Sequence, residues 1–305
     1  MNTNRKYNFP LFREEDSAAI VNARIGSNVD ARTHLIAETV VRHLHAAVKE
    51  IEPTHDEWHA AIRFLTDTGH MCTDWRQEFI LLSDVLGVSM LVDAINHRRP
   101  DQATENTILG PFFVEGVEAS PHGVDICKDG KGEPLVVVAS VRDTEGKPIQ
   151  GAVIDVWQTN DDGFYDVQQK GIQPEGNLRG KFVSDADGAF WFKSVKPRHY
   201  PIPDDGPVGK LLRKLGRHPN RAAHMHFLVQ APGYDTVITH IFSPDCPWLA
   251  EDTVFGVKES LIGNFVSHAD QHEARSLGFT IPFWSVHQDF VLNRTKTGFF
   301  VSPGA

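Results

Sequence analysis

The sequence has little of what marks secreted, membrane or nucleic-acid-binding proteins. Its three cysteines, Cys72, Cys127 and Cys246, are odd in number and far apart among 305 residues, which argues against a disulfide framework and a thiolate metal site. No uncharged run approaches the roughly 18 residues of a membrane-spanning helix, and the first residues contain no apolar signal segment. The net charge of -10 disfavours nucleic acid and anionic membrane surfaces as partners. We therefore expect a cytoplasmic protein, not a membrane protein, with buried free thiols and a small-molecule partner.

The spacing of apolar residues changes near residue 104. Before it, residues 31–52 and 78–96 have helical spacing, and a capping box at residues 54–57 begins another helix. After it, short segments rich in Val, Ile, Phe and Trp alternate with turns; they are residues 134–141, 151–157 and 180–192, the last folded at 185–188. This order predicts an α+β chain, with a helical N-terminal domain (1–104) and a mainly antiparallel β-sandwich or barrel (105–305).

His224 and His226 are the first candidates for a functional site. They flank Met225 and begin an apolar segment, residues 227–229, that ends in the turn sequence of residues 231–233. Because side chains alternate along a strand, both imidazoles should point to one face. Such a pair is either half of a metal site or a partly buried pair without a ligand, and the pair alone leaves both interpretations open.

Two tyrosines are candidates for completing a metal site. The chain has only four, and Tyr165 and Tyr200 lie in turn-rich segments of the strand-rich region. Taken singly, each is more typical of a packing residue with a hydrogen-bonded hydroxyl. Two phenolates beside two imidazoles suit a hard trivalent ion such as Fe(III) better than Zn(II), whose usual ligands are Cys, His and carboxylate. The four residues together therefore predict iron.

Four motifs then occur in an order and spacing typical of one family. They are Leu109-Gly110-Pro111-Phe112, the Asp161-Gly163-Tyr165 turn, residues 200–207, and Arg221-x-x-His224-x-His226. On these residues the sequence resembles the intradiol ring-cleavage dioxygenases over nearly its whole length. Residues 204–209 and 252–260 are most similar to those of the hydroxyquinol 1,2-dioxygenases, with the catechol 1,2-dioxygenases as the alternative.

The resemblance implies a ligand set, a reaction and an assembly. Tyr165, Tyr200, His224 and His226 would bind one non-haem Fe(III) per chain with a hydroxide, and Tyr200 would leave as substrate arrives and serve as a base. O2-dependent cleavage of hydroxyquinol (benzene-1,2,4-triol) would give 3-hydroxy-cis,cis-muconate, which tautomerises to maleylacetate, and catechol would give cis,cis-muconate. The N-terminal helices would form a homodimer and enclose a phospholipid.

Arg221 and His240 are the neighbours of this ligand set in the sequence. Arg221 is the candidate that stabilises negative charge on the ring, because a guanidinium stays protonated; apart from the resemblance, a surface arginine is an equal interpretation. His240 stands where many catechol-cleaving relatives carry glutamine. We expect it to alter hydrogen bonding around the ligands and do not count it as a ligand.

A pocket for a flat aromatic ring should be apolar with a few polar points. The positions that line the ring in the family correspond to Leu81, Asp84, Leu109, Gly110, Pro111, Phe112, Ile202, Pro203 and Val254. Asp84 stands out, because a carboxylate in an apolar seam is costly without a partner. We hypothesise that it accepts a hydrogen bond from the third hydroxyl of hydroxyquinol; the alternative is an aspartate on the helix surface.

Two other classes of function stay open. A zinc hydrolase using the histidine pair should have a carboxylate ligand nearby, and the sequence contains no His-Glu-x-x-His. A non-catalytic β-sandwich that binds a partner through its loops gives no reason for two tyrosines and two histidines to converge.

Overall fold

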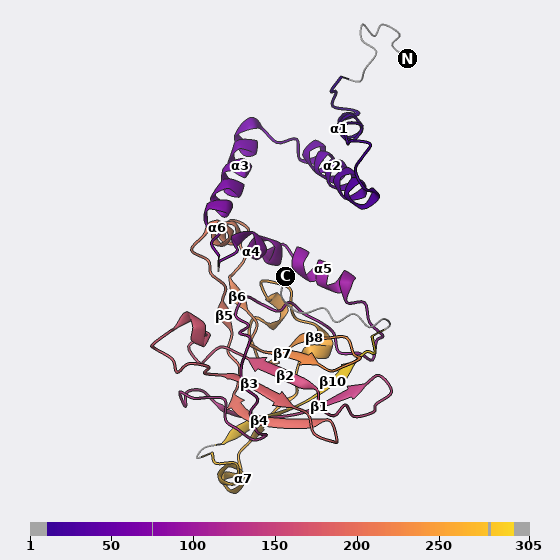
Figure 1. The fold of residues 1–305 in the computed structure, drawn as a ribbon. Helices are drawn as coiled ribbons and strands as arrows, with labels where there is room; N and C mark the ends of the chain where they lie inside the picture. Colours follow the sequence, from indigo (N-terminus) through magenta and orange to yellow (C-terminus); the bar gives the residue numbers. More distant parts are fainter. Residues whose placement is uncertain (1–10, 75, 280–281, 296–305) are drawn as a thin grey trace. The chain divides into compact units, whose positions relative to one another are not determined.

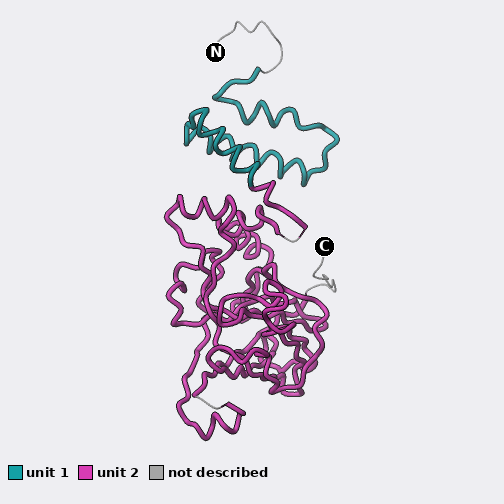
Figure 2. The backbone as a smooth tube through the Cα atoms, turned by 90° about the vertical axis from the view of Figure 1, so that its left-hand side faces the viewer, with its two compact units in different colours: residues 1–67 teal, residues 68–305 magenta. Residues whose placement is uncertain are grey.

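The computed structural model describes residues 11–74, 76–279 and 282–295. These fall into two compact units, residues 1–67 and 68–305, which Figure 2 shows in two colours. Residue 104, where the sequence predicts a domain boundary, lies inside the second unit. The division of the chain at that residue stays a prediction.

The first unit contains helices α1 (Ser17–Asn22) and α2 (Ala31–Ile51) and most of α3 (His55–His70). Asp30 begins α2, because its carboxylate accepts hydrogen bonds from the backbone N–H groups of Arg32 and Thr33. The predicted capping box begins α3: the N–H of Thr54 donates to Glu57 Oε2 (2.8 Å), and the N–H of Glu57 donates to Thr54 Oγ1 (3.3 Å). Both helix starts were therefore predictable from local sequence.

The second unit begins with two helices where the sequence predicts one. The expected helix over residues 78–96 is wrong at its centre, where α4 (Glu78–Val85) ends and α5 (Val88–Asn96) begins. Gly87 adopts a left-handed φ of 73° there, which glycine accommodates at little cost. Glu78 is fully buried and accepts a hydrogen bond from the N–H of Val208 (3.2 Å) in α6 (Pro207–Lys214). This contact holds α4, which carries two predicted pocket residues.

Two four-stranded sheets form the body of the second unit (Figure 1). One has the order β4 (Ala189–Val195), β1 (Pro134–Asp143), β10 (Phe283–Leu292) and β9 (Phe265–His268). The other has the order β3 (Arg179–Val183), β2 (Val153–Trp157), β7 (His224–Gln230) and β8 (Val237–Phe242). Neighbouring strands are antiparallel except β1 and β10. The predicted α+β class with a mainly antiparallel β-sandwich is confirmed.

The shorter elements of this unit are a two-stranded ribbon, one helix and three 3-10 turns. They are β5 (Tyr200–Pro201), β6 (Asn220–Arg221), α7 (Gln271–Ser276), η1 (Asp166–Gln168), η2 (Leu249–Glu251) and η3 (Glu259–Leu261).

No helix among the described residues is long and apolar enough to cross a membrane, and the cellular location stays a prediction. The three cysteines are free as expected, and each is partly rather than fully buried.

The turn at residues 185–188 connects the two sheets. The N–H of Gly188 donates to the carbonyl of Asp185 (3.0 Å), so the chain folds back there as predicted. Its two arms, β3 and β4, nevertheless join different sheets and do not pair with each other. This arrangement lets Phe182 and Phe192 meet between the layers, with ring centroids 4.8 Å apart.

Strand β7 divides its side chains between the two faces of its sheet. Met225, Phe227 and Val229 belong to the apolar core that both sheets share. Because side chains alternate, His224 and His226 occupy the opposite face, as the sequence predicts. The packed core therefore holds β7 in place from the face of the sheet opposite the two histidines.

Candidate metal centre and active site

His226 lies in the middle of the outer face of its sheet. Its strand β7 runs between β2 and β8, and the register places Trp157 on one side of His226 and His240 on the other. The Trp157 ring stacks on His226 with centroids 4.6 Å apart and an interplanar angle of 11°. His224 and His226 are 1% and 2% exposed, so neither is a solvated surface residue.

The two tyrosines reach this face from separate segments. Tyr165 precedes η1, where the Gln168 side chain accepts a hydrogen bond from the backbone N–H of Tyr165 (2.9 Å). The next residue, Asp166, is held by the buried guanidinium of Arg179 (Nε to Oδ1, 2.7 Å). Tyr200 lies on β5 and pairs with Arg221 on β6, three residues before His224. Each tyrosine is therefore held by local backbone structure.

The structure brings all four predicted metal ligands together. Tyr165 Oη lies 3.1 Å from Tyr200 Oη and 3.0 Å from His226 Nε2. His226 Nε2 lies 3.2 Å from His224 Nε2. Two phenol oxygens and two ring nitrogens from three segments thus converge in a buried space.

The electrostatics of the site fit a hard cation. Burial and the neighbouring Tyr200 hold the pKa of Tyr165 well above 10, and burial raises the pKa of Tyr200, although the charge of Arg221 opposes it. Burial and the charge of Arg221 lower the pKa of His224 to about 3, and burial together with His224 lowers that of His226. The imidazoles are therefore neutral and can offer lone pairs, whereas the phenols need a nearby positive charge to ionise.

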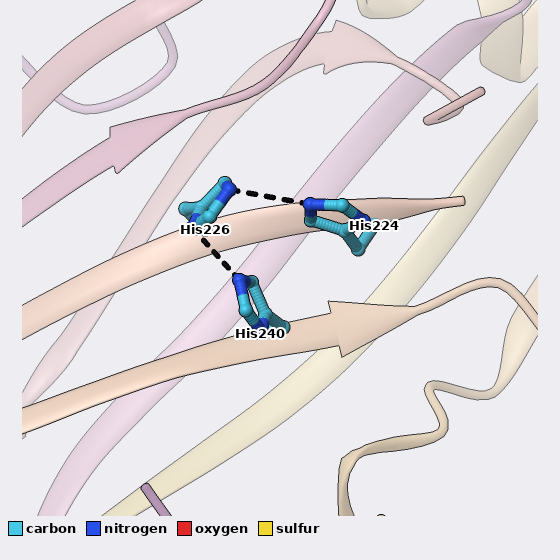
Figure 3. Close-up of side chains that lie close together, drawn as sticks. All are labelled: His224, His226 and His240. Atoms are coloured by element: carbon cyan, nitrogen blue, oxygen red, sulfur yellow. Dashed lines mark hydrogen bonds between the residues drawn. The ribbon is translucent and has the colours of Figure 1, made fainter. Parts of the chain in front are cut away.

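A third histidine completes the cluster in Figure 3. The ring nitrogens of His224, His226 and His240 include one from each residue within 4.8 Å of the others, a spacing that could hold a metal ion. His240 Nε2 lies 2.8 Å from His226 Nδ1, on the side of that ring away from Tyr165 and His224. His240 is thus in contact with a predicted ligand through the nitrogen that the tyrosine does not approach.

Arg221 is fully inside the protein and not on the surface. It is 4% exposed, and its Nε donates to Asp252 Oδ1 at 3.0 Å. Asp252 also accepts hydrogen bonds from the backbone N–H groups of Ala222 (2.9 Å) and Gly256 (2.7 Å). This carboxylate therefore joins Arg221, the start of β7 and the loop that carries Val254.

The predicted pocket residues differ in their surroundings. Leu81, Ile202 and Val254 pack in one apolar cluster, and Leu109 and Phe112 pack in another that includes both tyrosines. Gly110 lies against the His226 ring, where an added Cβ would come within 3.2 Å of Cε1. Pro111 and Pro203 are exposed.

Asp84 is partly buried on α4. Burial raises the pKa of its carboxyl, opposed by a hydrogen bond from Ser89 and by the charge of Arg221. The charge of Arg221 therefore acts on the Asp84 carboxyl, although the two side chains belong to different elements.

Sequence reasoning missed two supporting residues. Trp157 ends β2, and its place beside His226 follows from strand register, which no local pattern reveals. Asp252 belongs to a segment used only for the resemblance, and its pairing with Arg221 spans 31 residues. A separate cavity of about 480 Å³ lies between α5, residues 97–106 and β10, and none of the predicted site residues lines it.

Comparisons with known proteins agree with this geometry. A family model described as "Dioxygenase" matches residues 108–293, and one described as "Catechol dioxygenase N terminus" matches residues 30–104. This chain belongs to the intradiol ring-cleavage dioxygenases. The family uses non-haem iron. Because this chain is a member, the interpretations as a zinc hydrolase and as a non-catalytic binding protein are excluded.

Individual relatives of this intradiol dioxygenase cover almost the whole chain. The hydroxyquinol 1,2-dioxygenase of Rhizobium sp. (strain MTP-10005) is 58% identical over 284 residues, which are 93% of this chain and 96% of that protein. The crystal structure of hydroxyquinol 1,2-dioxygenase from Pseudomonas putida DLL-E4 matches with a TM-score of 0.87 and 46% identity, covering 92% of this chain and 99% of that one. Catechol 1,2-dioxygenase from Acinetobacter sp. ADP1 matches with a TM-score of 0.79 and 27% identity, covering 95% and 96%.

Proposed function

We propose that this intradiol dioxygenase cleaves hydroxyquinol with O2 between its two adjacent hydroxyl groups, giving 3-hydroxy-cis,cis-muconate and, by tautomerisation, maleylacetate. Catechol, giving cis,cis-muconate, is the alternative substrate. The observation that carries the proposal is the convergence of Tyr165, Tyr200, His224 and His226 on one buried face, in a chain whose relatives include hydroxyquinol 1,2-dioxygenases.

We propose that these four side chains hold one ferric ion. Two phenolate oxygens and two neutral imidazole nitrogens form a donor set that suits a hard trivalent cation. When bound, a ferric ion would supply the positive charge that favours the phenolate form of both tyrosines and the redox capacity that a reaction with O2 requires. Burial raises the pKa of both phenols, so their ionisation at this site requires a nearby cation.

We propose that Tyr200 and Arg221 take part directly in the reaction. An aromatic diol must lose protons to bind through both oxygens, and Tyr200 Oη is proposed to accept one of them. Burial raises the pKa of Tyr200 and the charge of Arg221 opposes this rise, so the positive charge acts at the oxygen in question. Because the guanidinium stays protonated and is held by Asp252, it can stabilise negative charge on the substrate ring without rearranging.

The apolar clusters around the ligands suit a flat ring. Leu109 and Phe112 pack with the tyrosines, and Leu81, Ile202 and Val254 are proposed to line the other side. Asp84 is the polar group on the α4 side. Burial raises the pKa of its carboxyl although Ser89 and the charge of Arg221 oppose this, and we propose that the third hydroxyl of hydroxyquinol donates a further hydrogen bond to it.

Steady-state turnover of hydroxyquinol and catechol, with oxygen uptake and iron content measured on the same preparation, tests the proposal. We expect about one iron per chain, a red colour from tyrosinate-to-iron charge transfer, and a higher kcat/KM for hydroxyquinol. A colourless protein, or one that contains zinc, would refute the iron site. A coloured protein that prefers catechol would refute only the substrate.

The role of Asp84 is tested by substitution with alanine. We expect Asp84→Ala to lower kcat/KM for hydroxyquinol by about 10-fold or more, since a lost hydrogen bond to a buried charged group contributes about 1.5–3 kcal/mol. Catechol lacks the third hydroxyl, so its kcat/KM should change little. An equal loss on both substrates would show that Asp84 supports the fold of α4 instead.

We also propose a homodimer through the N-terminal helices. Helix α2 has no buried residue, and Val40, Leu44 and Val48, spaced four residues apart on one face, are 50%, 60% and 55% exposed. Sedimentation velocity should show a dimer that Leu44→Glu dissociates and Arg42→Glu does not. A phospholipid bound by these helices stays a prediction, which mass spectrometry of an organic extract tests.

A further inference from the structure

His240 is a fully buried imidazole that the proposed reaction does not use. It is 0% exposed, and the β7–β8 register places it directly opposite His226. Its Nε2 lies 2.8 Å from His226 Nδ1, while its Nδ1 has no hydrogen-bond partner among the described residues. His240 Nε2 therefore contacts His226, and His240 Nδ1 has no hydrogen-bond partner among those residues.

The tautomer of His224 is set by its backbone. Its Nδ1 lies 2.5 Å from the carbonyl oxygen of Ala222, which can only accept, so Nδ1 carries the proton. A neutral imidazole that is protonated at Nδ1 presents a lone pair at Nε2. That lone pair faces His226 Nε2 at 3.2 Å.

Two ring nitrogens at this distance need something positive between them. If both presented lone pairs with nothing between, they would repel each other in a low-dielectric interior. A proton on His226 Nε2 or a cation bound by both nitrogens removes this repulsion, whereas the hydroxyl proton of Tyr165, 3.0 Å from His226 Nε2, would leave the two ring lone pairs facing each other. The two cases place the His226 proton on different atoms, since a neutral imidazole carries only one.

We propose, on the basis of the proposed ligand set, that His240 is a positioning residue for His226 and that the hydrogen bond between them reverses when a metal ion binds. Without metal, His226 Nε2–H donates to His224, and His240 Nε2–H donates to the bare Nδ1 of His226. With metal, His226 Nε2 is a ligand and has released its proton to solvent. The proton of His240 Nε2 passes along the hydrogen bond to His226 Nδ1, which then donates to His240 Nε2, and His240 takes up a proton from solvent at Nδ1. No proton is gained or lost by the pair of rings.

The unpartnered nitrogen of His240 determines which state is favoured without metal. In the metal-free arrangement this nitrogen is a bare acceptor, whereas in the metal-bound arrangement it is a buried N–H without an acceptor among the described residues. A buried donor without a partner is costly, so metal binding must overcome that cost. In return, His240 fixes the orientation and tautomer of His226, as second-shell partners of metal-bound histidines commonly do.

Nitrogen-15 NMR of histidine-labelled protein tests the reversal directly. Spectra are recorded on the full chain without metal and after loading with Ga(III), a diamagnetic substitute for Fe(III), and the His240 signals are assigned by their loss in His240→Gln. We expect the proton of His240 on Nε2 without metal and on Nδ1 with Ga(III). If it remains on one nitrogen although Ga(III) binds, the reversal is wrong.

Two variants separate positioning from direct ligation. In His240→Gln the amide oxygen can still accept from His226 Nδ1–H, whereas His240→Leu offers no acceptor. We expect iron affinity, measured by chelator competition, to fall by about 10- to 100-fold in His240→Leu and to stay near the wild-type value in His240→Gln. An equal loss in both variants would mean that His240 is itself a ligand and would overturn the proposal.

Two further measurements complete the test. They are the position of the charge-transfer band and thermal unfolding of the metal-free variants, which shows whether each variant folds. His240→Leu should shift the band, because a less strongly held His226 changes the field at the metal, while His240→Gln should restore it. Loss of folding in His240→Leu would leave the NMR result and His240→Gln to decide. Failure of wild-type protein to bind iron or Ga(III) would refute the ligand set, whereas binding without a change of tautomer would refute only the role of His240.

Discussion

Replacement of Asp252 by alanine is the most demanding test of the electrostatics described above. Asp252 and Arg221 are both buried, with side chains 2% and 4% exposed, and their ion pair is 3.0 Å long. Removing one partner leaves the other as an uncompensated buried charge, which costs about 3–5 kcal/mol. The backbone N–H groups of Ala222 and Gly256 would also lose their acceptor. We therefore expect Asp252→Ala to lower the free energy of unfolding by at least 3 kcal/mol, about the lower end of that range.

Asp205→Ala is the matched control, because it also removes a carboxylate from an arginine. The Arg76–Asp205 pair is 2.8 Å long, but the Asp205 side chain is 66% exposed. An exposed pair contributes about 0–1 kcal/mol, so burial alone should separate the two variants. Urea unfolding of the iron-loaded proteins measures both values. If Asp252→Ala costs no more than Asp205→Ala, the buried pair does not hold Arg221 as described.

The same pair predicts a pH dependence. Burial opposes ionisation of Asp252, but the charge of Arg221 and the N–H groups of Gly256 and Ala222 outweigh it, and its pKa lies below the usual 3.8. A lowered pKa gives stability that is present above pH 3.8 and lost as the pH falls through the folded value. The difference in stability between the wild type and Asp252→Asn should therefore shrink in acid. A difference that is constant from neutral pH down to pH 2, roughly the acid limit for such a pKa, would contradict the assignment.

Three further predictions concern the metal site. Gly110→Ala should lower stability by about 1–2 kcal/mol, because Gly110 has a φ of 76°. It should also reduce iron content, because the new Cβ would meet His226. The control Gly130→Ala, at a φ of 66° with no atom within 4 Å of the added Cβ, should lower stability and leave iron content unchanged. Tyr200→Phe should weaken iron binding and the charge-transfer band, whereas Tyr234→Phe should change neither; equal spectra in both variants would exclude Tyr200 as a ligand. Removal of iron by a chelator should lower Tm, with a loss of about 4 kcal/mol if free iron had been present at 1,000 times its Kd, and re-addition should restore it. His224→Ala should show no such chelator-dependent shift.

Some features of the site follow from local sequence. The alternation of His224-Met225-His226 against the apolar residues that follow them predicts one face for both imidazoles, and the structure confirms it. The capping box at Thr54 likewise predicts the start of α3. These features depend on covalent geometry and on hydrogen bonds within a few residues, so the sequence is sufficient to predict them.

Helical spacing alone misjudged the segment from Glu78 to Asn96. Apolar residues continue at helical spacing on both sides of Gly87, so the pattern predicts one helix. The break arises because Gly87 adopts a left-handed conformation and α4 is held to α6 through the buried Glu78. Spacing reports which side chains are apolar, and it does not report where the backbone changes direction.

Tertiary structure alone decided which residues meet. Strand register puts His240 and Trp157 on either side of His226, and a buried ion pair joins Arg221 to Asp252 across 31 residues. Tyr165 reaches the histidines from the segment before η1 and Tyr200 from β5, and both pack with Trp157 and Leu228 of the histidine-bearing sheet. The amino-acid sequence thus determined the types of donor and the face of the strand, because these are local properties. The distances between the donors came from the fold, because they depend on contacts between segments far apart in the chain.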